Sequence, residues 1–214
     1  MMKAWLQRFV GGRKSPASIV IVSGLPRSGT SMMMRMLEAG GIPPLTDSLR
    51  IADPDNPEGY YEFERVKQLD KGDTAWLADT QGKAIKIISA LLRHLPSTYS
   101  YKVIFVERHM AEVLASQRKM LARRAAHAAQ LSGAEKNDTT VDDAEMTKLF
   151  AQHLQETRQW LAQQANFAVL YVHYSDLLRD PATQAAQINQ FLGGGLDVSK
   201  MADVVDPALY RNRA

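Results

Sequence analysis

Residues 19–31 read IVIVSGLPRSGTS, and this stretch decides the fold. The apolar, β-branched run at its start is typical of a buried strand. The run passes into a turn bracketed by Gly24 and Gly29, and a helical pattern begins at Thr30. In such a turn, backbone N–H groups and the positive end of the helix dipole face one concavity, which suits an anionic oxygen. The sequence therefore predicts a phosphate-binding loop.

The residue types inside this loop limit which nucleotide it can hold. ATP- and GTP-binding loops read G-x-x-x-x-G-K-[ST]. Here Gly24–Ser31 reads GLPRSGTS, with Thr30 in place of the lysine and Arg27 inside the turn. Two hydroxyls and one guanidinium remain, which suit a terminal group less charged than a β,γ-phosphate pair. A sulfated 5′-phosphate fits that description.

A second pattern, an arginine at a strand end followed by a serine in a helix, lies further along the chain. The strand-like run Tyr101–Arg108 ends on a cation, and Ser116 follows Arg108 by eight residues in a helical pattern. Together with the loop, this pattern resembles the sulfotransferases that use 3′-phosphoadenosine-5′-phosphosulfate (PAPS). In that family the loop binds the 5′-phosphosulfate, and the arginine and serine bind the 3′-phosphate. The later stretch Tyr174–Pro181 also resembles the family, so the similarity covers roughly residues 17–194.

The resemblance implies a set of donor-binding residues and a catalytic role for Arg27. Arg27 and the two hydroxyls of the loop would hold the bridging and phosphate oxygens. No metal is expected, because the sulfuryl group carries less charge than a γ-phosphoryl group and the cations are side chains. The residues expected to bind PAPS are Pro26, Arg27, Ser28, Gly29, Thr30, Ser31, Arg108 and Ser116.

The general base is not fixed by the same motifs. Lys86 matches a catalytic lysine of the cytosolic sulfotransferases, but their catalytic histidine, two residues further on, is replaced by Ile88. The stretch Asp55–Glu64 (DNPEGYYEFE) resembles the N-P-x-G-[YF]-x-E segment of bacterial relatives and offers Glu62 as the base. Flanking aromatic residues can raise the pKa of such a carboxylate by desolvation. Two alternatives remain open: Glu62 is a solvated or ion-paired residue, or His94 is the base.

Composition sets limits that do not depend on any family. With 214 residues, of which 45% are hydrophobic and 23% charged, the chain fits one globular domain. The net charge of +3 does not require a nucleic-acid partner, and the absence of cysteine excludes disulfides and thiolate chemistry. No apolar run approaches the roughly 20 residues that cross a bilayer, so we expect a cytoplasmic protein without a transmembrane segment. No metal-ligand spacing links the five histidines, His94, His109, His127, His153 and His173.

Strand and helix patterns alternate along the chain, which indicates right-handed crossovers and a mainly parallel sheet. We therefore predict an α/β fold of three layers, doubly wound, of the P-loop nucleotide-binding type. Residues 1–16 are predicted to be a tail, 17–214 the domain, and about 109–165 an inserted helical hairpin. The predicted strands are Ser18–Ser23, Ala84–Ile88, Tyr101–Val106 and Phe167–His173, and the predicted helices include Thr30–Ala39, Ala111–Gln130 and Ala144–Gln164.

The function that these patterns favour is sulfuryl transfer from PAPS to a hydroxyl or amine. Two alternatives are a P-loop phosphotransferase or nucleotidase, and a non-catalytic nucleotide-binding module. The acceptor is a small molecule, sugar, lipid or peptide, and four aromatic residues are candidates to frame it: Tyr60, Tyr61, Phe63 and Trp76. Family members close the 3′-phosphate site with a late basic, glycine-containing loop. Arg211 or Arg213 is a candidate substitute here, and a frayed terminus is the simpler alternative. The sequence does not predict the oligomeric state.

Overall fold

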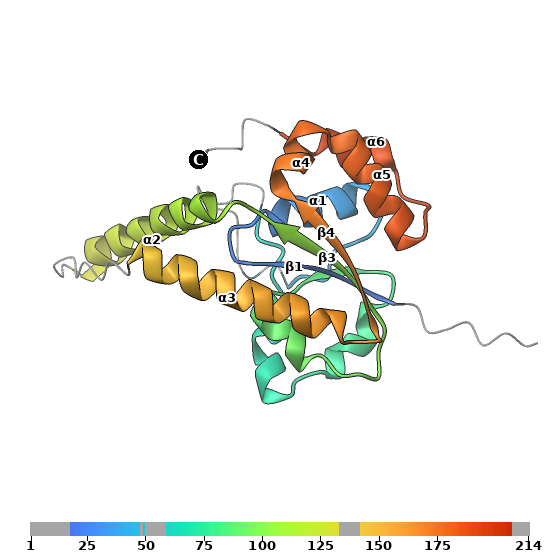
Figure 1. The fold of residues 1–214 in the computed structure, drawn as a ribbon, viewed down its shortest axis with the longest axis horizontal. Coiled ribbons are helices and arrows are strands. Elements are labelled where there is room, and N and C mark those ends of the chain that lie inside the picture. The colour runs from blue at the N-terminus through green and yellow to red at the C-terminus, as the bar shows by residue number, and fades with distance from the viewer. Residues whose placement is uncertain (1–17, 48, 50–58, 133–141, 207–214) are drawn as a thin grey trace, which may run out of the picture.

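A parallel sheet of four strands forms the centre of the molecule (Figure 1). This computed structural model describes residues 18–47, 49, 59–132 and 142–206. Along the sheet the order is β2-β1-β3-β4, and every neighbouring pair is parallel. All carboxyl ends of the strands therefore lie at one edge of the sheet, where parallel α/β proteins bind ligands. The strands are β1 (Ile19–Gly24), β2 (Ala84–Lys86), β3 (Tyr101–Glu107) and β4 (Phe167–His173).

Alternating side chains on the strands build two hydrophobic clusters, one on each face of the sheet. Val22 of β1 packs with Met33 and Leu37 on one face, whereas Ile21 packs with Trp76 and Leu161 on the other. The predicted three-layer α/β fold is therefore confirmed. The first face is covered by α1 (Thr30–Ala39), α4 (Tyr174–Arg179), α5 (Pro181–Leu192) and α6 (Val198–Asp203). The second is covered by three 3₁₀ helices, η1 (Glu64–Lys71), η2 (Ala75–Thr80) and η3 (Ser89–His94), and by α3 (Asp143–Ala162).

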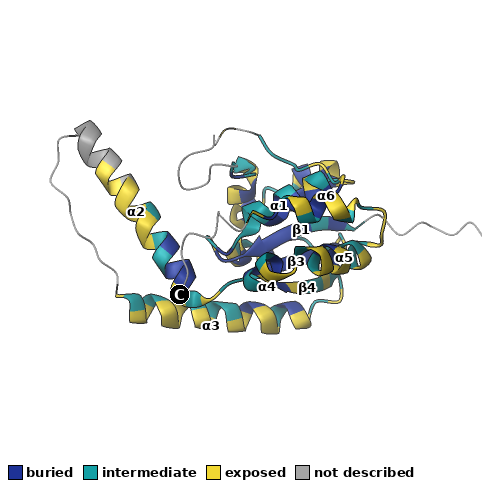
Figure 2. Cartoon of the chain, turned by 90° about the horizontal axis from the view of Figure 1, so that it is seen from above, coloured by how far each residue is buried: buried dark blue, intermediate teal, exposed yellow. Residues whose placement is uncertain are grey.

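The long helix α2 (Met110–Ser132) leaves the sheet edge and extends away from the body (Figures 1 and 2). Its described buried residues lie near its start, among them Glu112 and Ser116, and most of the residues between 117 and 126 whose burial is described are exposed. An ion pair of 2.9 Å between Arg118 and Asp143 connects α2 to α3. The helices of the predicted hairpin are thus present. The division into a tail and a domain with an insertion stays a prediction, and the tail lies outside the described residues.

Two local expectations differ from the structure. The strand predicted over 84–88 ends at Lys86, because Ile88 turns the chain into η3 after the N–H of Ile87 makes its 3.0 Å hydrogen bond to the Val22 carbonyl. No helix or strand is predicted over residues 64–80, which contain η1 and η2. Within the described part of the chain, none of the helices is both long and apolar enough to span a membrane.

Candidate active site

The loop between β1 and α1 has the strained backbone expected of a phosphate-binding turn. Gly24, Arg27 and Gly29 all have positive φ, at 149°, 72° and 106°. The N–H of Ser28 donates to the Leu25 carbonyl over 3.2 Å, which closes the turn, and Gly29 is the N-cap residue of α1. A left-handed conformation costs energy in a non-glycine residue such as Arg27, and such strain concentrates at functional sites.

Both glycines are required by neighbouring elements as well as by their backbone angles. A Cβ atom on Gly24 would lie 2.5 Å from the Val106 carbonyl oxygen of β3. A Cβ atom on Gly29 would overlap the ring of Tyr174, the first residue of α4. The loop is thus fitted against the ends of two other chain segments.

The loop, the end of β3, the start of α2 and the start of α4 meet in one group of side chains, which we call the arginine cluster: Arg27, Arg108, Glu112, Ser116 and Tyr174. Arg27 Nε donates to Ser116 Oγ over 2.9 Å. Arg108 Nε donates to Glu112 Oε2 over 2.7 Å, and its Nη1 donates to the Arg27 carbonyl over 3.3 Å. The Arg108 guanidinium also lies 4.3 Å from the centre of the Tyr174 ring. The structure therefore brings together the loop and the Arg108–Ser116 pair, which are far apart in sequence.

The arginine cluster is largely shielded from solvent. The side chains of Arg108 and Glu112 are 8% and 3% exposed. Burial raises the pKa of the Tyr174 hydroxyl, and the nearby Arg108 opposes that rise. The Tyr174 phenol therefore stays protonated at neutral pH and can act as a hydrogen-bond donor.

Ser28 places a buried hydroxyl in the loop, and Ser23 places another at the end of β1. The Ser28 side chain is 1% exposed, and its Oγ has no hydrogen-bond partner in the described part of the protein. A buried hydroxyl without a partner costs about 1–3 kcal/mol, and such groups are uncommon in native structures. A ligand oxygen at the loop would satisfy the Ser28 hydroxyl.

Lys86 and the segment 59–63, which we call the strap, form the other side of the candidate site. Lys86 Nζ lies 3.5 Å from Ser31 Oγ in the first turn of α1. The same ammonium donates to the Tyr60 carbonyl. Lys86 therefore connects the end of β2 to both the loop and the strap.

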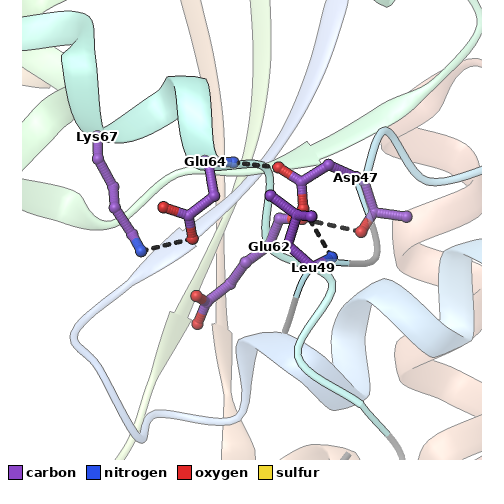
Figure 3. A network of polar contacts seen from close by, with 6 residues as sticks. Asp47, Leu49, Glu62, Glu64 and Lys67 are labelled. Carbon is purple, nitrogen blue, oxygen red and sulfur yellow. Dashed lines mark hydrogen bonds and ion pairs between the residues drawn. The ribbon is translucent and has the colours of Figure 1, made fainter. Parts of the chain in front are cut away.

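The strap is held by main-chain contacts around Glu62 (Figure 3). Thr46 Oγ1 donates to the Glu62 carbonyl over 2.8 Å, and the Glu64 N–H donates to Asp47 Oδ2 over 2.6 Å. Tyr61 has a φ of 52°, and its hydroxyl donates to Glu38 Oε2 over 2.7 Å. Figure 3 shows the Glu62 side chain pointing away from Asp47.

Of the four aromatic residues proposed to frame the acceptor, Tyr61 and Phe63 are partly buried on the strap, and the other two are buried. Trp76 is 2% exposed and packs edge-on against Phe63 in the core below the sheet. Tyr60 is also buried, at 5% exposure. Trp76 as an acceptor contact is therefore wrong, because its indole fills the hydrophobic cluster and its N–H donates to the Asp73 carbonyl.

The remaining predicted residues are distributed as follows. Pro26 is exposed at the tip of the loop, and Thr30 and Ser31 are partly buried in the first turn of α1. His94 is exposed at the end of η3, on the segment that leads back to the start of β3, and none of its described contacts reaches the loop. Arg211, Arg213 and the residues 50–58 lie outside the described part.

Two members of the arginine cluster had no predicted role. Glu112 could have been found, since it follows Arg108 by four residues, the spacing of a helical ion pair. Tyr174 has no local signal, because its contact with Gly29 depends on how β4 and α4 dock against the loop. Among the described residues, no group of three or more histidine and carboxylate side chains is arranged to hold a metal ion.

A parallel sheet with a glycine-bracketed loop at its carboxyl edge defines the P-loop class of α/β proteins. Within that class, the chain belongs to the sulfotransferase family: the family model described as "Sulfotransferase domain" matches residues 18–212. A sequence comparison with curated proteins gave no match.

Solved sulfotransferase structures share the fold. The sulfotransferase domain of the Synechococcus PCC 7002 olefin synthase is 19% identical with a TM-score of 0.52, and the match covers 99% of this chain and 88% of that one. Sulfotransferase STF1 of Mycobacterium tuberculosis is also 19% identical with a TM-score of 0.52, over 88% of this chain and 71% of that one. The sulfotransferase of Alicyclobacillus acidocaldarius is 16% identical with a TM-score of 0.50, over 90% and 87% of the two chains.

Proposed function

We propose that this protein transfers a sulfuryl group from PAPS to a hydroxyl or amine acceptor. The observation that carries the proposal is the arginine cluster, in which Arg27 of the loop contacts both Arg108 and Ser116. Those two residues are expected to bind the 3′-phosphate, and Arg27 the 5′ end. Their contact supports one nucleotide engaging both groups at once.

The chain supplies the groups that such a donor requires. The N–H groups at the start of α1, the guanidinium of Arg27 and the hydroxyls of Thr30 and Ser31 would hold the phosphosulfate oxygens. The unpartnered hydroxyl of Ser28 adds a further donor at the same loop. Donors that are oriented before the reaction stabilise the negative charge that develops on the leaving 5′-phosphate.

The acceptor must lose a proton as its oxygen or nitrogen attacks the sulfur. We assign this step to Glu62, because its main chain is held by Thr46 and it lies on the strap that Lys86 connects to the loop. Lys86 would place a positive charge between the loop and the strap, where it can stabilise the transferring group. The acceptor is a small molecule, sugar, lipid or peptide with a hydroxyl or amine.

Calorimetry with the product 3′-phosphoadenosine-5′-phosphate (PAP) tests the donor assignment. We expect PAP to bind at least tenfold more tightly than ATP with Mg²⁺, since the loop lacks the lysine that clamps a γ-phosphate. Arg108→Ala should abolish this preference. Lys119→Ala is the matched control, because Lys119 is an exposed cation on α2. ATP binding as tight as PAP binding would refute PAPS as the donor.

A further inference from the structure

We infer that Glu112 is a positioning residue that fixes the orientation of Arg108 for binding the 3′-phosphate. This inference rests on the proposed function, because it assumes that Arg108 binds that phosphate. It assigns Glu112 no contact with the ligand. The residue acts through the guanidinium that it holds.

The contact between the two side chains is short and buried. Arg108 Nε lies 2.7 Å from Glu112 Oε2, and the two side chains are 8% and 3% exposed. Hydrogen bonds between charged groups are shorter and stronger than neutral ones, and they are directional. Because water has little access to this pair, the carboxylate restricts the rotation of the guanidinium more than an exposed ion pair would.

Two further contacts leave the guanidinium little freedom. The Tyr174 ring covers one face at 4.3 Å, and the Arg27 carbonyl accepts a hydrogen bond from Nη1 over 3.3 Å. The Tyr174 ring and the Glu112 carboxylate therefore restrain the guanidinium through two different contacts. A planar guanidinium binds phosphate through paired N–H groups, so its plane and direction decide how well it does so.

The position of Glu112 on α2 places it beside both expected phosphate ligands. Glu112 and Ser116 are four residues apart on α2, which puts them on one side of the helix, and Arg108 lies two residues before the helix begins. Glu112 also lies in the first turn of α2, where the helix dipole favours a negative side chain. The helix therefore carries two residues that serve the phosphate site: Glu112, which orients Arg108, and Ser116, which is expected to bind the same phosphate as Arg108.

Electrostatics alone would not favour a carboxylate at this place. A negative charge beside a phosphate site opposes the attraction of the phosphate to Arg108. An ion pair kept only for stability could be replaced by apolar residues at no loss. Orienting the guanidinium offsets this unfavourable charge. A correctly oriented Arg108 binds the phosphate through two N–H groups at once, and this contact is stronger than one from a guanidinium that rotates freely.

The test compares the binding of PAP with that of adenosine 5′-phosphate, which lacks the 3′-phosphate, in the full-length protein. In Glu112→Ala we expect PAP affinity to fall by about 10–100-fold and adenosine 5′-phosphate affinity to stay within about threefold. Glu112→Gln keeps an oxygen that accepts from Arg108 Nε, so it should retain most of the preference for PAP. Thermal unfolding without ligand reports the stability of each variant separately.

Several outcomes separate this inference from the proposed function. If Glu112→Ala weakens the binding of PAP and of adenosine 5′-phosphate equally, Glu112 only maintains the local fold. If Glu112→Gln loses as much of the preference for PAP as Glu112→Ala does, the charge of Glu112 alone matters. Either result overturns the positioning role. If the alanine variant does not fold, Glu112→Asp replaces it: this variant keeps the charge but shortens the reach, and an unchanged preference would refute the inference. A wild-type protein that does not prefer PAP would instead refute the proposed function.

Discussion

The two sides of the candidate site are built in different ways. The arginine cluster rests on the ends of β3, α2 and α4, and its polar groups are joined by side-chain hydrogen bonds and largely buried. The strap lies in an irregular segment and is held mainly through its backbone, at the carbonyls of Tyr60 and Glu62. Groups on regular elements are positioned more rigidly than groups on loops. The arginine cluster is thus defined by contacts between side chains, whereas the described contacts of the strap mainly fix the course of its main chain.

The largest expected effect lies on the strap. Glu62→Gln should lower turnover by about 10²–10⁴-fold, because it removes the carboxylate assigned to take the acceptor proton. PAP affinity should stay within about twofold of the wild-type value, since the arginine cluster is unchanged. The measurement is the rate of PAP formation from PAPS with the acceptor that supports the fastest wild-type rate.

Glu64→Gln is the matched control for this variant. Glu64 lies two residues further along, and its carboxylate pairs with the exposed Lys67. We expect its turnover to remain close to wild type. Unchanged turnover in Glu62→Gln would remove Glu62 as the base and leave the strap without a catalytic role.

The next effect lies on the loop and concerns stability as well as binding. Gly29→Ala should destabilise the protein by about 2–4 kcal/mol, since the new Cβ combines a left-handed backbone with overlap on Tyr174. PAP affinity should fall as well, because displacement of Tyr174 releases one face of Arg108. Urea unfolding and calorimetry measure the two effects.

Gly72→Ala separates backbone strain from overlap. Gly72 also has a positive φ, of 84°, but no atom lies within 4 Å of where its Cβ would be. We expect this control to lose about 1 kcal/mol and to bind PAP normally. Equal losses in the two variants would mean that the contact between Gly29 and Tyr174 contributes nothing.

A smaller effect tests the link between the loop and α2. Ser116→Ala should weaken PAP binding by about tenfold, because the variant removes a hydroxyl expected to bind the 3′-phosphate. The exposed Ser199→Ala, on α6, is the control. If adenosine 5′-phosphate binding is weakened to the same extent, Ser116 supports Arg27 rather than the 3′-phosphate.

The same contrast explains what the sequence could predict. The loop was predictable because strand, turn and helix are neighbours in the chain. The Arg108–Ser116 pair was predictable because only eight residues, from the end of β3 into α2, separate its members. The parallel sheet then brings both to one edge. The burial of Trp76 and the contact of Lys86 with the Tyr60 carbonyl depend on how residues 59–80 fold under and across the sheet. That path is set by tertiary packing. The nearness of Trp76 to Glu62 in sequence therefore did not predict where its side chain lies in the fold.

The smallest expected effect is on stability and concerns His153 on α3, which lies outside both the arginine cluster and the strap. Burial lowers the pKa of His153 below the ordinary 6.5, Arg93 lowers it further and Glu156 partly opposes this. Its Nε2 lies 2.8 Å from Ser89 Oγ. Because the folded state disfavours the protonated ring, the unfolded chain binds more protons below about pH 6.5. The associated stability is therefore complete above that pH and is lost as the pH falls toward the lowered pKa.

Thermal unfolding at about pH 7.5 and about pH 5.5 measures this loss. Wild type should lose about 1–3 °C more than His153→Gln between the two conditions. His94→Gln, which changes an exposed histidine, should behave as wild type does. An identical loss in wild type and His153→Gln would show that burial and Arg93 do not disfavour the protonated ring. PAP binding by His153→Gln should equal that of the wild type at the higher pH, because His153 contacts neither the arginine cluster nor the strap in the described part of the protein.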